Sequence, residues 1–179
     1  MSDLTRSTGI VATVLAVAAL VCGFLFSARA TGRRRRPAWW LDLHNWLGGL
    51  ALAFLGLHVL ASWLDSTSGI GFVQILIPGT AGDRWGIALG VVAAYFYTVA
   101  VFTTWPRRTA NRRLWRVLHL GTVIAIPLTL LHAFRSGSDA AQMTFRLGVI
   151  ALFATAAYGL FLRIIGVLGA GDSSPKNKM

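Results

Sequence analysis

The sequence predicts an all-α integral membrane protein, a bundle of five transmembrane helices with its N-terminus outside the membrane and its C-terminus in the cytoplasm. Hydrophobic residues make up 55% of the 179 residues, and the mean hydropathy of +0.63 is far above that of an ordinary soluble domain. Five apolar segments are each long enough to cross a bilayer, which takes about 20 residues. Basic residues cluster between these segments, as in the cytoplasmic loops of membrane proteins.

The five predicted spans are 10–26, 39–64, 85–105, 114–134 and 145–168. The first could instead be a cleaved signal peptide, because small residues at 27–30 offer a cleavage site. We favour a retained helix, since its basic cluster follows the apolar run, whereas a signal peptide carries basic residues before it. The outer segment 70–77 is too short to cross and is expected to lie along the membrane surface or to cap the bundle. We therefore expect one transmembrane domain over residues 1–170 and a short cytoplasmic tail over 171–179.

The distribution of charge orients the predicted bundle. The loops after the first and third spans hold most of the arginines and should be cytoplasmic; they contain Arg29, Arg33, Arg34, Arg35 and Arg36, and Arg107, Arg108, Arg112 and Arg113. Loop 65–83 has no lysine or arginine, and in loop 135–142 Arg135 is balanced by Asp139, so both loops should face outward. The net charge of +11 therefore reflects topology, and we expect membrane lipid rather than nucleic acid as a partner.

All four histidines lie in two of the spans. His44 and His58 are in the second span, and His119 and His132 are in the fourth. Ionisable side chains inside a membrane are costly and by default mark function. Both spans run outward from a basic loop, so His44 and His119 share the inner level, and His58 and His132 share the outer level. The step of 14 residues from His44 to His58 corresponds to roughly 21 Å along a helix, at about 1.5 Å per residue.

Facing imidazoles on two helices are the ligands that bind haem iron from both sides. We therefore predict two b haems stacked across the bilayer, the inner iron bound by His44 and His119 and the outer iron by His58 and His132. Cys22 is the only cysteine, which excludes a cysteine-ligated iron–sulfur centre. Two alternatives stay open at this point. The protein could be a haem-free membrane scaffold in which hydrogen bonds between helices satisfy the histidines. It could also be a metal-ion transporter, although the spans lack the carboxylates that hard cations prefer.

The fourth span needs a distortion to present both of its histidines to one partner helix. A step of 14 residues returns to within about 40° of the same helix face, but the step of 13 from His119 to His132 does not. Pro127 lies between them, and a proline inside a helix removes a hydrogen bond and kinks the helix. We hypothesise that this kink aims His132 at the outer haem.

Glycines and arginines supply further candidate residues. Four glycines near the predicted ligands leave room either for the haem faces or for ordinary helix packing: Gly48, Gly49, Gly56 and Gly121. Gly86 and Gly90 are assigned to helix packing. Cationic candidates for binding the haem propionates are Arg36, Arg112, Arg113 and Arg116 on the inner side and Arg135 on the outer side. Each arginine is also explained by topology or by snorkelling to the interface.

The histidine spacings and their surroundings carry a family resemblance. His44-x13-His58 lies within LDLHNWLGGLALAFLGLHVLA, and His119-x12-His132 lies within RLWRVLHLGTVIAIPLTLLHAF. With the basic loop before each helix, these motifs make the chain similar to the ferric reductase-like transmembrane domain family. This family includes NADPH oxidases, eukaryotic ferric reductases and the bacterial haem subunit MsrQ. The chain resembles a stand-alone, bacterial-type membrane subunit of the family. The resemblance implies bis-histidine haem b at both levels and electron flow through the membrane. Larger members have six helices, and reductive members add a flavin and nicotinamide domain, so this chain is not expected to oxidise a nicotinamide alone.

We expect the protein to be the haem subunit of an oxidoreductase in a bacterial cytoplasmic membrane. Electrons would come from a separate cytoplasmic or membrane donor, a flavoprotein such as a flavin reductase or a quinol, and would pass from the inner haem to the outer one. The expected acceptor on the outer face is a ferric chelate, oxygen, or an exported flavin- or molybdenum-containing protein. Because bis-histidine ligation leaves no open iron position, a relay is favoured over direct reduction of ferric chelate or oxygen at the outer haem edge. Direct reduction is the alternative function.

Overall fold

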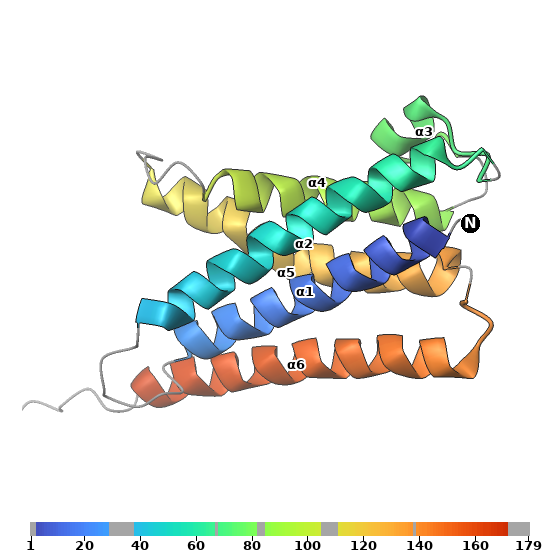
Figure 1. Ribbon diagram of the computed structural model, residues 1–179. Coiled ribbons are helices and arrows are strands. Elements are labelled where there is room, and N and C mark those ends of the chain that lie inside the picture. The colour runs from blue at the N-terminus through green and yellow to red at the C-terminus, as the bar shows by residue number, and fades with distance from the viewer. Residues whose placement is uncertain are drawn as a thin grey trace, which may run out of the picture.

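The computed structural model describes residues 3–28, 38–66, 68–81, 85–104, 111–137 and 139–171, and every regular element within these ranges is a helix. The five long helices are α1 Asp3–Ser27, α2 Ala38–Leu64, α4 Trp85–Phe102, α5 Arg112–Ser136 and α6 Met143–Gly171 (Figure 1). Each is long and apolar enough to cross a membrane, so the five predicted spans are confirmed. The first helix begins earlier than expected, at Asp3, and Trp105, the predicted end of the third span, lies outside the described residues.

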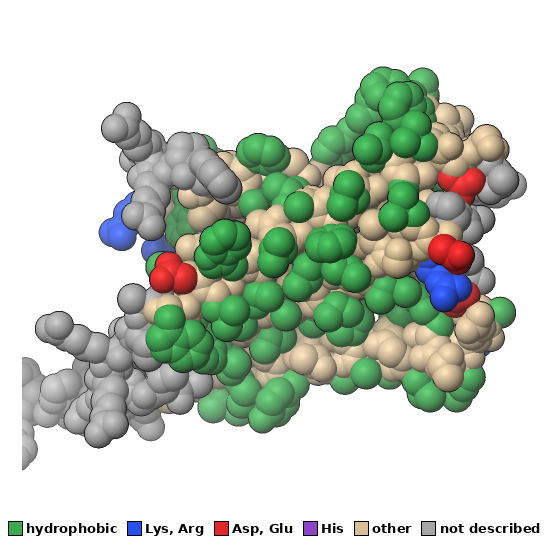
Figure 2. All heavy atoms as spheres, viewed as in Figure 1, with side chains coloured by type: hydrophobic (Ala, Val, Ile, Leu, Met, Phe, Trp, Pro, Cys, Tyr) green, Lys and Arg blue, Asp and Glu red, His purple; other side chains and the backbone are tan. Residues whose placement is uncertain are grey.

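The surface and the interior of the bundle are built from different apolar residues. Large side chains cover the flanks, where Trp46, Val117 and Leu168 are 71%, 67% and 69% exposed. Figure 2 shows these hydrophobic flanks in green, with the charged side chains gathered at the two ends of the bundle. The buried positions are mostly small, which lets membrane helices approach closely; they include Ala16, Ala51, Ala93, Ala100 and Ala125. Because lipid rather than water must cover such flanks, the chain is an integral membrane protein.

The long helices form two closely packed pairs. Helix α1 packs along α2, and α4 packs along α5, while α6 lies mainly against α1, so that α1 runs between α2 and α6 (Figure 1). The two histidine-bearing helices, α2 and α5, belong to different pairs and do not pack directly against each other. The helix pairs meet at mid-height in a small buried core that includes Val17, Ala51, Tyr97 and Ile126. The histidine side chains of α2 and α5 therefore meet in the space between these two helices.

A short helix, α3 Phe72–Leu76, caps one end of the bundle. It packs against α2 and α4, and its Phe72 ring lies 5.9 Å from the ring of Trp63. The Tyr95 hydroxyl on α4 donates a 2.6 Å hydrogen bond to the carbonyl of Leu76. The glycine that follows, Gly79, has a φ of 90°, a conformation that glycine adopts without steric cost. The prediction that segment 70–77 does not cross the membrane is confirmed.

Helix α5 runs through Pro127 without interruption. It begins after Asn111, whose side chain accepts hydrogen bonds from the backbone N–H groups of Arg113 and Leu114, a typical N-cap. It continues as one helix to Ser136, with Pro127 in its interior. The role of this proline in aiming His132 stays a prediction.

Candidate functional site

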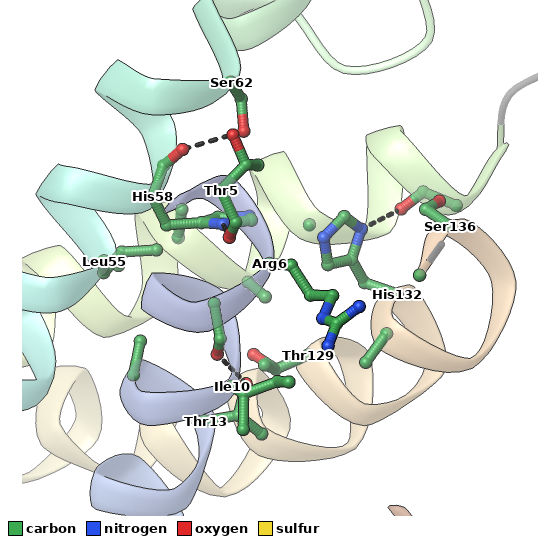
Figure 3. A pocket seen from close by; sticks show the side chains of 18 of the residues that line it. Thr5, Arg6, Ile10, Thr13, Leu55, His58, Ser62, Thr129, His132 and Ser136 are labelled. Atoms are coloured by element: carbon green, nitrogen blue, oxygen red, sulfur yellow. Dashed lines mark hydrogen bonds between the residues drawn. The ribbon is translucent and has the colours of Figure 1, made fainter. Parts of the chain in front are cut away.

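The four histidines meet in two pairs across the gap between α2 and α5. The ring centroids of His44 and His119 are 5.9 Å apart with an angle of 70° between the ring planes. Those of His58 and His132 are 6.2 Å apart with an angle of 75°. The structure therefore brings together the residues that the sequence paired, at two levels of the bundle, although the helices themselves are not in contact. Figure 3 shows the second pair, with His58 and His132 projecting into one space from different helices.

Backbone carbonyls orient three of the four imidazoles. In each case Nδ1 lies within hydrogen-bond distance of a carbonyl on the helix that packs alongside: His44 on Ala19 (2.8 Å), His58 on Thr5 (2.9 Å) and His132 on Gly86 (2.7 Å). A carbonyl only accepts, so Nδ1 carries the proton and donates it, which leaves Nε2 with a free lone pair. This is the arrangement that orients metal-bound histidines in proteins, where the second ring nitrogen is held by a carbonyl or carboxylate.

A glycine beside each of these carbonyls lets the imidazole approach the neighbouring helix. A Cβ added at Gly9 would lie 2.9 Å from Nδ1 of His58, and one at Gly90 would lie 2.7 Å from Nδ1 of His132. A Cβ at Gly23 would lie 3.1 Å from Cε1 of His44. These distances are shorter than van der Waals contact, so a side chain at any of the three positions would push against the ring.

These glycines differ from those that the sequence singled out. Gly90 was assigned to helix packing, yet it makes room for His132, and the two glycines of α1, Gly9 and Gly23, were not selected at all. Gly49 and Gly56 would meet nothing within 4 Å, so neither lies against an imidazole or a neighbouring helix. The sequence does contain a signal for the two glycines of α1, because the step of 14 residues from Gly9 to Gly23 equals the step from His44 to His58.

The fourth imidazole, His119, is held in a different way. Its Nδ1 is a buried nitrogen without a hydrogen-bond partner in the described part of the chain. The ring stacks instead on the indole of Trp115, with centroids 5.2 Å apart and planes inclined by 16°. The indole Nε1 in turn donates a 3.4 Å hydrogen bond to Oγ1 of Thr104. Trp115 is thus a positioning residue for His119, as well as an aromatic side chain near a span end.

The two levels differ in the space around them. A largely apolar cavity of about 1120 Å³ surrounds His58 and His132, and residues of all five long helices line it. This volume is ample for a cofactor, since ligand pockets commonly measure about 300–1,000 Å³. His44 and His119 line a second cavity of only about 110 Å³. A macrocycle at that level would need the surrounding side chains to move apart.

The predicted propionate-binding arginines fall into three groups. Arg135 lines the cavity of the His58/His132 pair. The exposed inner-side candidates line neither cavity; they are Arg112, Arg113 and Arg116. Arg36 lies outside the described residues.

Two further arginines line the cavities. Arg6 of α1 lines the cavity of the His58/His132 pair (Figure 3), and its Nε lies 3.1 Å from Oδ2 of Asp139. Arg163 of α6 lines the cavity of the His44/His119 pair. The sequence could have marked Arg163 as a functional residue, because it lies within an apolar span, where a charged side chain is costly.

The donor set at each level is a pair of imidazoles. Within the described ranges, no three histidine, cysteine, aspartate or glutamate side chains lie together. Two imidazoles are sufficient for haem, because the porphyrin supplies the other iron ligands. The free Nε2 atoms of His44, His58 and His132, the separation of the paired rings and the cavity around His58 and His132 fit that group.

Fold and site together define a class: helical membrane proteins with histidine pairs on two helices, an arrangement typical of membrane electron carriers. Residues 8–130 match the family model described as ferric reductase like transmembrane component, and the chain belongs to this family. Domains of this family are generally haem-binding, and membership indicates transmembrane electron transfer. The matched region contains His44, His58 and His119 and ends two residues before His132, so α6 lies beyond it. Comparison with curated proteins and with solved structures found no match.

Proposed function

We propose that the protein carries electrons across the membrane through two b haems, one bound by His44 and His119 and the other by His58 and His132. The observation that carries this proposal is the pair of facing imidazoles at each level. Metal–imidazole bonds are about 2 Å long, so two imidazoles on opposite sides of one iron have ring centroids about 6 Å apart. The observed separations of 5.9 and 6.2 Å support that geometry. When bound, each haem supplies a one-electron ferric/ferrous couple.

The residues around the imidazoles favour a relay over substrate binding at iron. Carbonyl hydrogen bonds hold His44, His58 and His132 with Nε2 free, and stacking on Trp115 holds His119. Two imidazoles on one iron leave no open coordination position for a substrate. Electrons would therefore enter and leave without a substrate bound to iron.

The charges at the two ends of the bundle support an orientation with the His44/His119 level on the cytoplasmic side. Among the described residues, the end near His44 and His119 carries an excess of basic side chains; its charged residues are Arg112, Arg113, Arg116, Arg163 and Asp42. The opposite end is balanced; its charged residues are Arg6, Arg135, Arg146, Asp3, Asp65 and Asp139. Basic ends stay in the cytoplasm, so the N-terminus would be outside and the C-terminus inside.

This orientation gives the two levels different partners. A cytoplasmic flavoprotein or a membrane quinol would donate electrons at the His44/His119 level. At the His58/His132 level an acceptor outside the membrane would receive them, and we propose a ferric chelate, oxygen, or an exported flavin- or molybdenum-containing protein. We place the chain, with its single haem-binding domain over residues 1–170, in a bacterial cytoplasmic membrane.

One observation favours direct reduction of a small substrate as a second candidate function. The cavity around His58 and His132 is far larger than its counterpart, and Arg6 and Arg135 line it near the end of the bundle. Because Arg6 is paired with Asp139, Arg135 is the guanidinium group that would attract an anionic ferric chelate toward the haem edge. The protein would then be a reductase that depends on a partner only for its electrons.

Proteoliposomes separate the proposals. Purified haem-loaded protein is reconstituted with an impermeant reductant inside and a ferric chelate outside, and external ferrous iron is measured. We expect electron transfer across the bilayer at a rate that His44→Ala or His58→Ala lowers to that of protein-free liposomes, because each change breaks the chain of redox centres.

The acceptor decides between the two candidates in that experiment. External iron reduction without any added protein supports direct reduction, whereas haem reduction without iron reduction supports a relay to a protein acceptor. If the purified wild-type protein has no low-spin b-type α band in its reduced-minus-oxidised spectrum, the haem proposal is wrong and the haem-free scaffold is favoured.

Arg163 is the residue best placed to bind the carboxylates of the haem at the His44/His119 level. Its Nη1 donates a 2.5 Å hydrogen bond to Oγ of Ser27, and its Cζ lies 5.9 Å from the ring centroid of Phe24. Among the described residues it has no carboxylate partner. A cation inside a membrane requires a counter-charge, and a haem propionate at this cavity would supply one.

Neutralising Arg163 should therefore lower the midpoint potential of one haem, because a nearby cation favours the reduced, less positive iron. Arg163→Gln is expected to lower this potential and to weaken haem retention, whereas Arg163→Lys should stay close to the wild type. Ser27→Ala breaks the hydrogen bond between α1 and α6 but keeps the charge, so it controls for a purely structural role. Equal effects of Ser27→Ala and Arg163→Gln in a redox titration would show that the arginine only joins the two helices.

A further inference from the structure

Helices α1 and α6 run in the same direction but pack closely only along their C-terminal halves. There a Cβ added at Gly159 would lie 3.3 Å from Cδ2 of Phe24, and one at Gly166 would press against the carbonyl of Ala28. In the N-terminal half of α6, a Cβ added at Gly148 would meet nothing within 4 Å. Figure 1 shows the same difference, because the two helices lie close together near the end of α1 and diverge toward its N-terminus.

The His58/His132 cavity extends into the space where these two helices diverge. Its lining residues there come from both helices: Ile10, Thr13 and Val14 from α1, and Gly148, Leu152 and Thr155 from α6. Ile10 and Val14 remain 42% and 45% exposed, so α6 covers them only in part. One side of the cavity is therefore a loosely packed pair of helices rather than a closed wall.

The side of the cavity between α2 and α4 is held more firmly. The short helix α3 packs against both of these helices at this end of the bundle. At mid-height the Tyr97 hydroxyl of α4 donates a 3.3 Å hydrogen bond to the Gly48 carbonyl of α2. A path between α2 and α4 would require these contacts to break.

An ion pair joins α1 to the chain just before α6 at the divergent end. Nε of Arg6 lies 3.1 Å from Oδ2 of Asp139, and Nη1 lies 3.5 Å from Oδ1. The buried Asp139 also accepts a 3.0 Å hydrogen bond from Nε2 of Gln142. Arg6 and Asp139 both line the cavity, where Figure 3 shows Arg6. The pair therefore ties the two helices together at the point where their own packing is weakest.

We propose that haem enters and leaves the His58/His132 cavity between the N-terminal halves of α1 and α6, and that the Arg6–Asp139 ion pair is the latch that closes this path. This inference rests on the proposed function. Haem is a flat apolar ring with two carboxylates at one edge, and amphipathic molecules lie at the membrane surface with their apolar part among the acyl chains. A path between apolar helices with its charged end at the membrane surface suits such a molecule.

The rate of haem loss from the detergent-purified, haem-loaded protein tests this inference. Excess apomyoglobin captures released haem, and the kinetic phase that is absent from His58→Ala reports the haem at this level. Asp139→Asn and Arg6→Gln each break the ion pair and should raise the loss rate roughly fivefold. The equilibrium partition of haem between the protein and apomyoglobin should stay close to that of the wild type, because a latch changes the path and not the bound state.

Two further changes act on the same path in the opposite direction. Arg6→Asp combined with Asp139→Arg re-forms the pair with reversed charges and should restore the wild-type rate. Gly148→Leu fills open space between the diverging helices and should slow haem loss. Gly56→Leu is its matched control, since Gly56 also has nothing within 4 Å but does not line the cavity.

The two single variants separate a latch from a direct haem contact. If Arg6 instead held a haem carboxylate, Arg6→Gln would lower the equilibrium retention of haem and Asp139→Asn would not raise the loss rate, which would overturn the inference. Unchanged loss rates in both variants would overturn it as well. Either result, with haem still bound by the wild-type protein, leaves the proposed electron transfer intact. A wild-type protein that binds no haem would overturn both.

Discussion

Replacing His58 by alanine is expected to remove about half of the bound haem, because an iron that loses one of two protein ligands is no longer held from both sides. His132→Ala should remove the same half, since its ring faces that of His58 at 6.2 Å. The measurement is haem per protein by the pyridine haemochrome method, combined with a redox titration that shows which haem persists. In both variants the surviving haem should have the same midpoint potential.

The double variant sharpens this test. If the two histidines bind one iron, His58→Ala combined with His132→Ala should lose no more haem than either single change, because residues of one unit are not additive. Ser62→Ala is the matched control, since Ser62 lines the same cavity and donates to the carbonyl of His58 without being a ligand. An α band of full intensity in a variant that lacks all four histidines would disprove the ligand assignment.

Gly90→Ala should disrupt the same haem without touching a ligand. The added Cβ would lie 2.7 Å from Nδ1, 2.8 Å from Cε1 and 3.0 Å from Cγ of His132. The whole ring must therefore move, which breaks its 2.7 Å hydrogen bond to the Gly86 carbonyl. We expect loss of most of the haem at the His58/His132 level, with the other haem retained, measured by haem content and difference spectra.

A second glycine provides the control for this change. An alanine favours helix over a glycine by up to about 1 kcal/mol, so helical glycine substitutions are not intrinsically harmful. Gly49 on α2 has nothing within 4 Å of an added Cβ, and Gly49→Ala should keep both haems with equal or greater thermal stability. Equal haem content in Gly90→Ala and the wild type would show that the ring tolerates displacement.

The sequence alone was sufficient for the spans and the histidine pairing, for a physical reason. In a bilayer each helix satisfies its own backbone, so a span is a local property that length and apolarity reveal. Histidines in apolar surroundings are conspicuous, and their positions along two spans place them at two levels. The structure has the five helices and brings together His44 with His119 and His58 with His132. Ligation of iron by these residues stays a prediction.

The surroundings of the histidines depended on which helices pack together, and no local pattern specifies that. Gly9, Gly23 and Gly90 lie against imidazoles because α1 packs along α2 and α4 packs along α5. The same reason explains Arg163, which reaches the His44/His119 cavity from α6, a helix without a histidine. Among the predicted arginines that the structure describes, only Arg135 lines either cavity.

The sequence by itself thus determined a five-span membrane protein with two levels of paired histidines. Tertiary structure alone decided how each imidazole is held: three by a carbonyl beside a glycine, and His119 by Trp115 and Thr104. The physical reason is that helix formation and burial in lipid depend on local composition. A hydrogen bond or a steric contact between side chain and backbone depends on distances of a few ångströms between helices far apart in the chain.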